Sequence, residues 1–194
     1  MDKISYAIGL SMGQNLLGSG VTKMEYNDLA EGIKDVLEKQ QPKISYQEAQ
    51  TILGKFFQEL EEKIAGEQKA AGEKFLEENK KREGVKVTPS GLQYEVIEST
   101  LGQKPKATDT VKVHYEGTLI DGTVFDSSYQ RGEPIEFGLN QVIAGWTEGV
   151  QLMSVGSKYK LYIPYQLGYG AQGAGGSIPP YSALIFTVEL LGIK

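Results

Sequence analysis

The sequence predicts an α+β fold, in which an all-helical first half precedes a bent antiparallel β-sheet wrapped around one short helix. Residues 1–83 contain a single proline, and their apolar residues recur at helical spacings. From Gly84 onward, short alternating runs lie between proline and glycine turn signals. Strand patterns lie on both sides of the one helical pattern there, which favours an α+β arrangement. We therefore expect two domains, 1–84 and 85–194.

Three helices are expected in the first domain. The first covers Ile4 to Leu17 and ends at the glycines that follow. The second ends before Pro42 and presents one apolar face, formed by Leu29, Ile33, Val36 and Leu37. Ser45 and Glu48 then form a capping box, in which each side chain can bind an orphan backbone N–H. This box opens a long connecting helix over about residues 45–83.

The long helix carries an apolar stripe in its first half, whereas its second half is rich in Glu, Lys, Gln and Ala. A helix that is polar all round either bridges domains through solvent or is unstable alone. The three helices offer too little apolar material for a sealed core. We therefore expect residues 1–84 to share their apolar faces with a second copy in a two-fold homodimer. A monomeric three-helix cap is the alternative.

The second domain reads as short strands around one helix. The pair Asp121-Gly122 is a strong signal for a two-residue hairpin turn. One short helix fits around Ile143 to Met153. The strand patterns fall at residues 92–97, 110–117, 123–125, 158–163 and 184–190.

Composition excludes several classes of function. The net charge is −5 and no basic cluster stands alone, so a nucleic-acid surface is not expected. The chain has no cysteine, which excludes disulfides and Cys-ligated metals. No stretch approaches the roughly 18–20 apolar residues of a membrane span, so no membrane partner is expected. Because no signal peptide is visible, we expect a cytoplasmic location, or a periplasmic one if an export signal has been removed.

Two further motifs do not support a site of their own. His114 is the only histidine, which excludes His-based triads within one chain, and we interpret it as a packing or hydrogen-bonded residue. Residues 168–173 match GxGxxG, but a dinucleotide site needs a helix to follow. Pro179 and Pro180 come soon after instead. We therefore expect neither a cofactor nor a metal.

Six blocks of the second domain carry a specific resemblance. They are residues 113–117, 122–128, 142–146, 168–171, 178–180 and 184–191. In order and spacing they resemble the FKBP-type peptidyl-prolyl cis/trans isomerases over about residues 90–194. The first domain, from Ser5 to Asn15 and through the long charged helix, looks like the dimerisation arm of the macrophage-infectivity-potentiator subfamily.

The resemblance implies an apolar pocket for a proline ring, with Trp146 as its floor. It assigns catalysis to Tyr115, Asp126, Tyr169 and Phe186. Substrate binding is assigned to Phe125, Arg131, Phe137, Val142, Ile143, Trp146 and Ile178. Asp126 would be held at the rim by Tyr115 and Arg131. The Tyr169 hydroxyl and the Ile143 N–H would bind the substrate backbone.

The sequence departs from the family pattern at three positions expected on or near the pocket rim. Ile135 replaces a residue that is usually aromatic, Ser177 replaces a larger aliphatic residue, and Tyr181 lies at a variable position. These changes bear on the residue preferred before proline and on the affinity for macrolide inhibitors. Residues 173–176 should form a mobile loop, because glycine costs more to order.

The expected function is cis/trans isomerisation of X–Pro bonds in peptides and in folding or unfolded proteins, with chaperone activity from the dimeric arm. This reaction breaks no bond between heavy atoms, so it needs no nucleophile, metal or redox group. The alternative is a non-catalytic holdase that uses the proline pocket only for binding. Small-molecule binding without turnover is a third class, which no separate feature supports.

Overall fold

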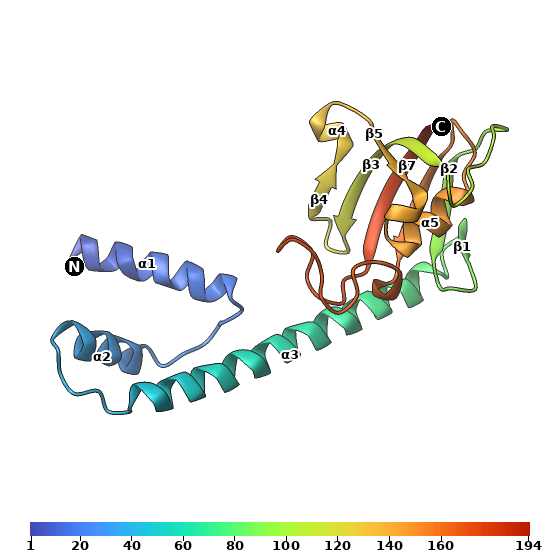
Figure 1. Ribbon diagram of the computed structural model, residues 1–194. Coiled ribbons are helices and arrows are strands. Elements are labelled where there is room, and N and C mark those ends of the chain that lie inside the picture. The colour runs from blue at the N-terminus through green and yellow to red at the C-terminus, as the bar shows by residue number, and fades with distance from the viewer. The chain divides into compact units, whose positions relative to one another are not determined.

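A computed structural model describes residues 1–194, and the chain divides into two compact units, Met1–Ile64 and Ala65–Lys194. The predicted α+β class is confirmed, since helices come first and an antiparallel sheet with a helix follows (Figure 1). The sequence placed the domain boundary after residue 84, whereas the units divide inside the third helix. No helix has both the length and the apolar character that crossing a membrane requires.

The first unit contains α1 (Lys3–Gly18), α2 (Tyr26–Leu37) and the first turns of α3 (Tyr46–Asn79). The Asp2 carboxylate begins α1 by accepting the Ser5 N–H at 2.7 Å. The Ser45 hydroxyl accepts the Glu48 N–H at 3.1 Å, so half of the predicted capping box is formed. No residue of α1 or α2 is buried. These helices therefore form no sealed core within one chain.

The third helix ends at Asn79, four residues before the predicted end at 83. The buried Asn79 amide donates to Gln93 Oε1 at 2.9 Å, and Gln93 Nε2 donates to the Leu76 carbonyl at 2.9 Å. Arg82 in turn donates to Asn79 Oδ1 at 2.8 Å. The bond from Gln93 reaches a backbone carbonyl in the last turn of the helix, and the bond from Asn79 ties the helix end to Gln93.

The second unit is built on one antiparallel sheet of seven strands, in the order β1-β2-β6-β7-β3-β4, with β5 paired to β3 (Figure 1). The strands are β1 (Val85–Val87), β2 (Gln93–Glu98), β3 (Thr110–Leu119), β4 (Val124–Ser127), β5 (Ile135–Gly138), β6 (Lys158–Ile163) and β7 (Leu184–Ile193). The short strands β1 and β5 were not predicted. Short helical segments are α4 (Ser128–Arg131), η1 (Leu139–Gln141), α5 (Ala144–Gln151) and η2 (Tyr165–Leu167).

Helix α5 packs closely on β6, and two glycines make this approach possible. A Cβ atom on Gly145 would lie 2.5 Å from Ile163 Cγ2, and one on Gly149 would lie 2.7 Å from Leu161 Cδ1. Between these glycines, Trp146 joins the buried core formed by the inner faces of the central strands. The close packing therefore fixes where the Trp146 ring stands relative to the sheet.

Candidate active site

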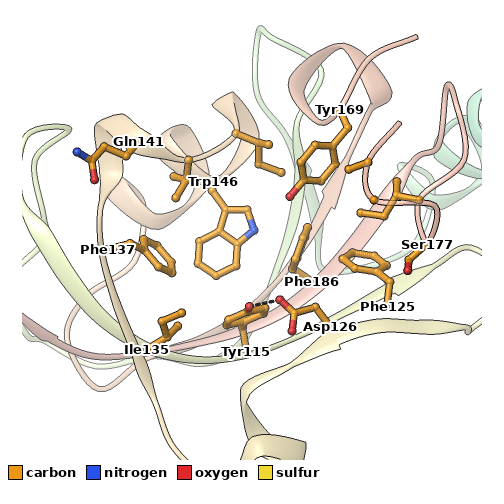
Figure 2. Close-up of a pocket in the computed structure, with 15 residues that line it drawn as sticks. Tyr115, Phe125, Asp126, Ile135, Phe137, Gln141, Trp146, Tyr169, Ser177 and Phe186 are labelled. Atoms are coloured by element: carbon orange, nitrogen blue, oxygen red, sulfur yellow. Dashed lines mark hydrogen bonds between the residues drawn. The ribbon is translucent and has the colours of Figure 1, made fainter. Parts of the chain in front are cut away.

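The second unit holds a cavity of about 460 Å³ in which most of the predicted site residues meet (Figure 2). It is lined by Tyr115, Phe125, Asp126, Ile135, Phe137, Gln141, Val142, Ile143, Trp146, Tyr169, Ala174, Gly175, Ser177, Ile178 and Phe186. Every site residue that the sequence proposed is on this wall except Arg131. Arg131 is not among the lining residues, but it forms an ion pair with Asp126, which lines the cavity.

Trp146 stands at the centre of the cavity and is surrounded by three aromatic rings. Its ring centroid lies 5.3 Å from that of Tyr115, 5.1 Å from Phe137 and 5.2 Å from Phe186. All three pairs meet edge to face, the favoured geometry for aromatic contacts. Trp146 is only 4% exposed, so these contacts hold its indole rigidly. The result is a preformed apolar floor, as Figure 2 shows.

A polar group lies at one edge of this apolar cavity. The Tyr115 hydroxyl donates a hydrogen bond to Asp126 Oδ2, and Arg131 Nη1 donates one to Oδ1. Arg131 Nη2 also donates to the Tyr115 hydroxyl at 3.2 Å, and the guanidinium lies 5.7 Å from the centre of the Tyr115 ring. Both carboxylate oxygens are thus hydrogen-bonded, which fixes the position and orientation of the Asp126 carboxylate.

These contacts keep Asp126 ionised. Partial burial would raise its pKa, but the hydrogen bonds from Tyr115 and Arg131, with the charge of Arg131, outweigh burial and lower the pKa below its ordinary value. Burial, and then the hydrogen bond to Asp126, raise the pKa of Tyr115. The site therefore presents a fixed negative charge and a neutral phenol at neutral pH.

Two hydrogen-bond donors that belong to lining residues have no partner inside the chain. The Tyr169 hydroxyl points into the cavity in Figure 2, and it makes no hydrogen bond in the structure. Burial, and then the charge of Asp126, raise the pKa of Tyr169, so this phenol stays protonated. The N–H of Ile143, just before α5, is also unpaired. Two peptide carbonyls could accept from these groups.

Some residues at the rim of the cavity were expected from the sequence, and others were not. Ile135 and Ser177 line the cavity, as expected. Gln141 was not proposed, and only its place directly before Val142 could have indicated it. Tyr181 is not among the residues that line the cavity; its ring meets that of Tyr165 edge to face, with centroids 5.1 Å apart, and lines a separate groove beside α3.

The single histidine lies outside the cavity lining. His114 Nδ1 is 2.9 Å from the hydroxyl of Ser128, and its ring stacks on Tyr129 at 4.7 Å. The interpretation of His114 as a packed, hydrogen-bonded residue is therefore confirmed. The structure contains no group of three or more acidic or histidine side chains that could hold a metal ion.

Comparison with known proteins identifies both parts of the chain. Residues 102–191 match the family model described as FKBP-type peptidyl-prolyl cis-trans isomerase, and residues 1–96 match the model described as the domain amino terminal to it.

Three relatives extend the likeness over the whole chain. The FKBP-type peptidyl-prolyl cis-trans isomerase FkpA of Aeromonas hydrophila is 49% identical over all of this chain and 76% of its own length. The FKBP-type 22 kDa peptidyl-prolyl cis-trans isomerase of Escherichia coli is 48% identical, over 97% of this chain and 93% of its own length. The crystal structure of Escherichia coli FkpA matches with a TM-score of 0.78 at 42% identity, covering 99% of this chain and 95% of that one.

Proposed function

The chain belongs to the FKBP-type peptidyl-prolyl cis-trans isomerases and catalyses the isomerisation of X–Pro bonds, and we propose that it does so in the cavity over Trp146. The observation that carries this assignment is the pairing of a preformed aromatic floor with a fixed carboxylate. A proline ring is apolar and fits such a floor, while the peptide groups beside it need polar partners.

The aromatic floor acts on the electronic structure of the bond. Amide resonance sets a rotation barrier of about 18–20 kcal/mol and makes the planar peptide charge-separated. An apolar surround, with Trp146 beneath the ring, removes water from the imide and disfavours this planar form relative to the twisted one. Lowering the barrier by about 7 kcal/mol would accelerate rotation roughly 10⁵-fold.

The polar groups hold the peptide on both sides of the twisting bond. The Ile143 N–H and the Tyr169 hydroxyl would bind carbonyl oxygens and so hold the flanking chain while the bond rotates. Asp126 supplies a negative charge at a fixed position. Because the amide dipole turns as the bond twists, a fixed charge can stabilise the twisted state more than the planar state.

The direct test is cis/trans exchange of a short Leu-Pro peptide, followed by NMR with the intact protein. We expect acceleration at catalytic protein concentrations and a large loss in Asp126→Asn, which keeps the shape but removes the charge. Asp121→Asn is the matched control, because Asp121 lies in an exposed hairpin turn away from the cavity. Wild-type turnover by folded Asp126→Asn would remove the carboxylate from the mechanism.

We further propose that the first unit forms a homodimer interface. A cavity of about 610 Å³ between α2 and α3 is lined almost entirely by apolar residues. Its wall includes Val36, Leu37 and Leu53, which are 57%, 77% and 53% exposed in one chain. Side chains of this size are rarely left in water over a continuous surface. A second copy would cover the same surface on both chains, as two-fold symmetry requires.

Members of this family bind proline-containing peptides and proteins. The exposed apolar surface of the first unit favours a second activity, which is the holding of unfolded chains while the cavity isomerises them. If folded protein gave no acceleration of peptide exchange, a non-catalytic holdase would be the better description. We also propose that macrolide inhibitors bind this cavity, and competition with the Leu-Pro peptide would test it.

A further inference from the structure

Strand β3 pairs with β7 along nearly its whole length, but at His114 and Tyr115 its other edge has no strand partner. Its residues Thr110–Val113 pair with β5, and Glu116–Thr118 pair with β4. Tyr115 lies between these two stretches, and its side chain faces the cavity. Neither edge strand therefore provides a backbone partner for the N–H and C=O of Tyr115, although both groups are inside the folded unit.

A single hydroxyl group fills this gap. Ser128, fully buried at the start of α4, accepts the Tyr115 N–H at 2.7 Å and donates to the Tyr115 carbonyl at 3.1 Å. One side chain thus satisfies both backbone groups of Tyr115. It replaces the strand residue that would otherwise continue the ladder.

His114 provides the third hydrogen-bond partner of this hydroxyl. Ser128 Oγ carries one hydrogen, which it gives to the Tyr115 carbonyl, so it must act as acceptor toward His114 Nδ1 at 2.9 Å. This arrangement of hydrogen bonds requires the His114 tautomer that is protonated on Nδ1. The His114 ring is held in turn by stacking on Tyr129, whose hydroxyl donates to Glu189 at 3.1 Å. In this arrangement the Ser128 hydroxyl makes three hydrogen bonds and has no spare hydrogen-bonding capacity.

We propose that Ser128, oriented by His114, is a positioning residue that sets the Tyr115–Asp126 pair for catalysis. The inference rests on the proposed role of Asp126. Ser128 follows Asp126 by two residues on the segment that leaves β4, and it binds the backbone of the residue whose hydroxyl holds Asp126. Tyr115 and the segment that carries Asp126 are thus joined twice, through the Ser128 hydroxyl at the Tyr115 backbone and through the hydrogen bond between the Tyr115 and Asp126 side chains. Without the Ser128 hydroxyl, β3 and the end of β4 can separate at this point.

The test compares Ser128→Ala with Ser157→Ala in the intact protein. Ser157 is a matched control, since it is also buried and accepts a backbone N–H, that of Ser154, but does not line the cavity. We expect Ser128→Ala to lower kcat for the Leu-Pro peptide about tenfold while KM changes less than about twofold. Ser157→Ala should lower only the melting temperature.

A spectroscopic readout separates positioning from mere stability. The pKa of Tyr115, which burial and Asp126 raise, should fall in Ser128→Ala as the hydrogen bond to Asp126 weakens, and Tyr ζ-carbon NMR would follow it. An unchanged Tyr115 titration together with a wild-type kcat in folded Ser128→Ala would overturn the proposal.

His114→Phe provides a second, milder test that also applies if Ser128→Ala does not fold. Phenylalanine can still stack on Tyr129 but lacks both ring nitrogens, including the Nδ1 that contacts Ser128. We expect a loss of about threefold in kcat with the same direction of Tyr115 shift, and wild-type values for both would overturn the proposal. If Asp126→Asn were fully active, the proposed mechanism would fail. If only the Ser128 and His114 variants were fully active, the positioning role alone would fail.

Discussion

Gly72 on α3 lies directly against Ala183, so that a Cβ atom on Gly72 would be 3.1 Å from the Cβ of Ala183. Nearby, Gln68 donates to the Ser182 hydroxyl at 3.3 Å, and that hydroxyl donates to the Pro179 carbonyl at 2.8 Å. Pro179 follows Ile178, which lines the cavity. The last turns of α3 are therefore packed on the segment that carries part of the active site.

This packing predicts different results for two truncations. Removal of residues 1–64 should leave peptide isomerisation within about twofold of the intact protein, because the second unit keeps its own packing. Removal of residues 1–84 should lower the free energy of unfolding by about 2–4 kcal/mol, since it exposes the ring of Tyr162, now 2% exposed against Phe75.

Urea unfolding and peptide exchange of the two truncated proteins would measure both effects. Equal stability of the two fragments would show that residues 65–84 do not belong energetically to the isomerase unit.

The long helix shows what sequence can and cannot predict here. Its start was predicted to within a residue, because Ser45 and Glu48 form a local motif. Its end was missed, because the bonds between Asn79 and Gln93 join residues that only the fold brings together. The same holds in the site. Ordered motif blocks indicated the cavity wall, whereas the role of Ser128 depends on a gap between two edge strands that no local pattern reveals.

Gly117 should be required for the shape of the cavity. A Cβ atom at this position would lie 2.6 Å from the Phe125 ring and 2.8 Å from the Phe186 ring. We expect Gly117→Ala to displace both rings, to cost about 1–3 kcal/mol of stability, and to lower kcat/KM more than tenfold. Gly192→Ala is the control, because that glycine faces open space. Comparable kinetics for the two variants would contradict this role.

The pH dependence of activity should respond to Arg131. The folded pKa of Asp126 is depressed, so its contribution to stability is present above its ordinary pKa of 3.8 and is lost as the pH falls through the folded pKa. If catalysis needs the ionised carboxylate, protonation of Asp126 should not limit activity above pH 3.8. Activity should fall at lower pH, as Asp126 becomes protonated.

Arg131→Met removes a hydrogen bond and a positive charge, so burial should raise the pKa of Asp126 and shift the acidic fall in activity to higher pH. Carboxyl-carbon NMR of Asp126 and pH–rate profiles would measure the shift. Lys194→Met, which removes the exposed ion pair with Glu136, should leave the profile unchanged. Identical profiles for the Arg131→Met variant and the wild type would show that Arg131 does not tune Asp126.

If the groove of the first unit is the dimer interface, negative charges placed in it should dissociate the dimer without changing catalysis in the second unit. Val36→Asp combined with Leu53→Asp places two carboxylates on the apolar wall, where a second copy would have to bury them without partners. We expect a monomer by sedimentation equilibrium, unchanged isomerisation of a short peptide, and weaker assistance to the refolding of a proline-limited protein.

Gln40→Asp combined with Gln41→Asp is the matched control, because both residues are exposed and lie outside the groove while two negative charges are again added. This control should remain dimeric. A groove variant that sediments like the wild type would place the interface elsewhere. A monomeric variant with full refolding activity would instead show that the cavity over Trp146 suffices for protein substrates, because the second unit would then act without help from the surface of α2 and α3.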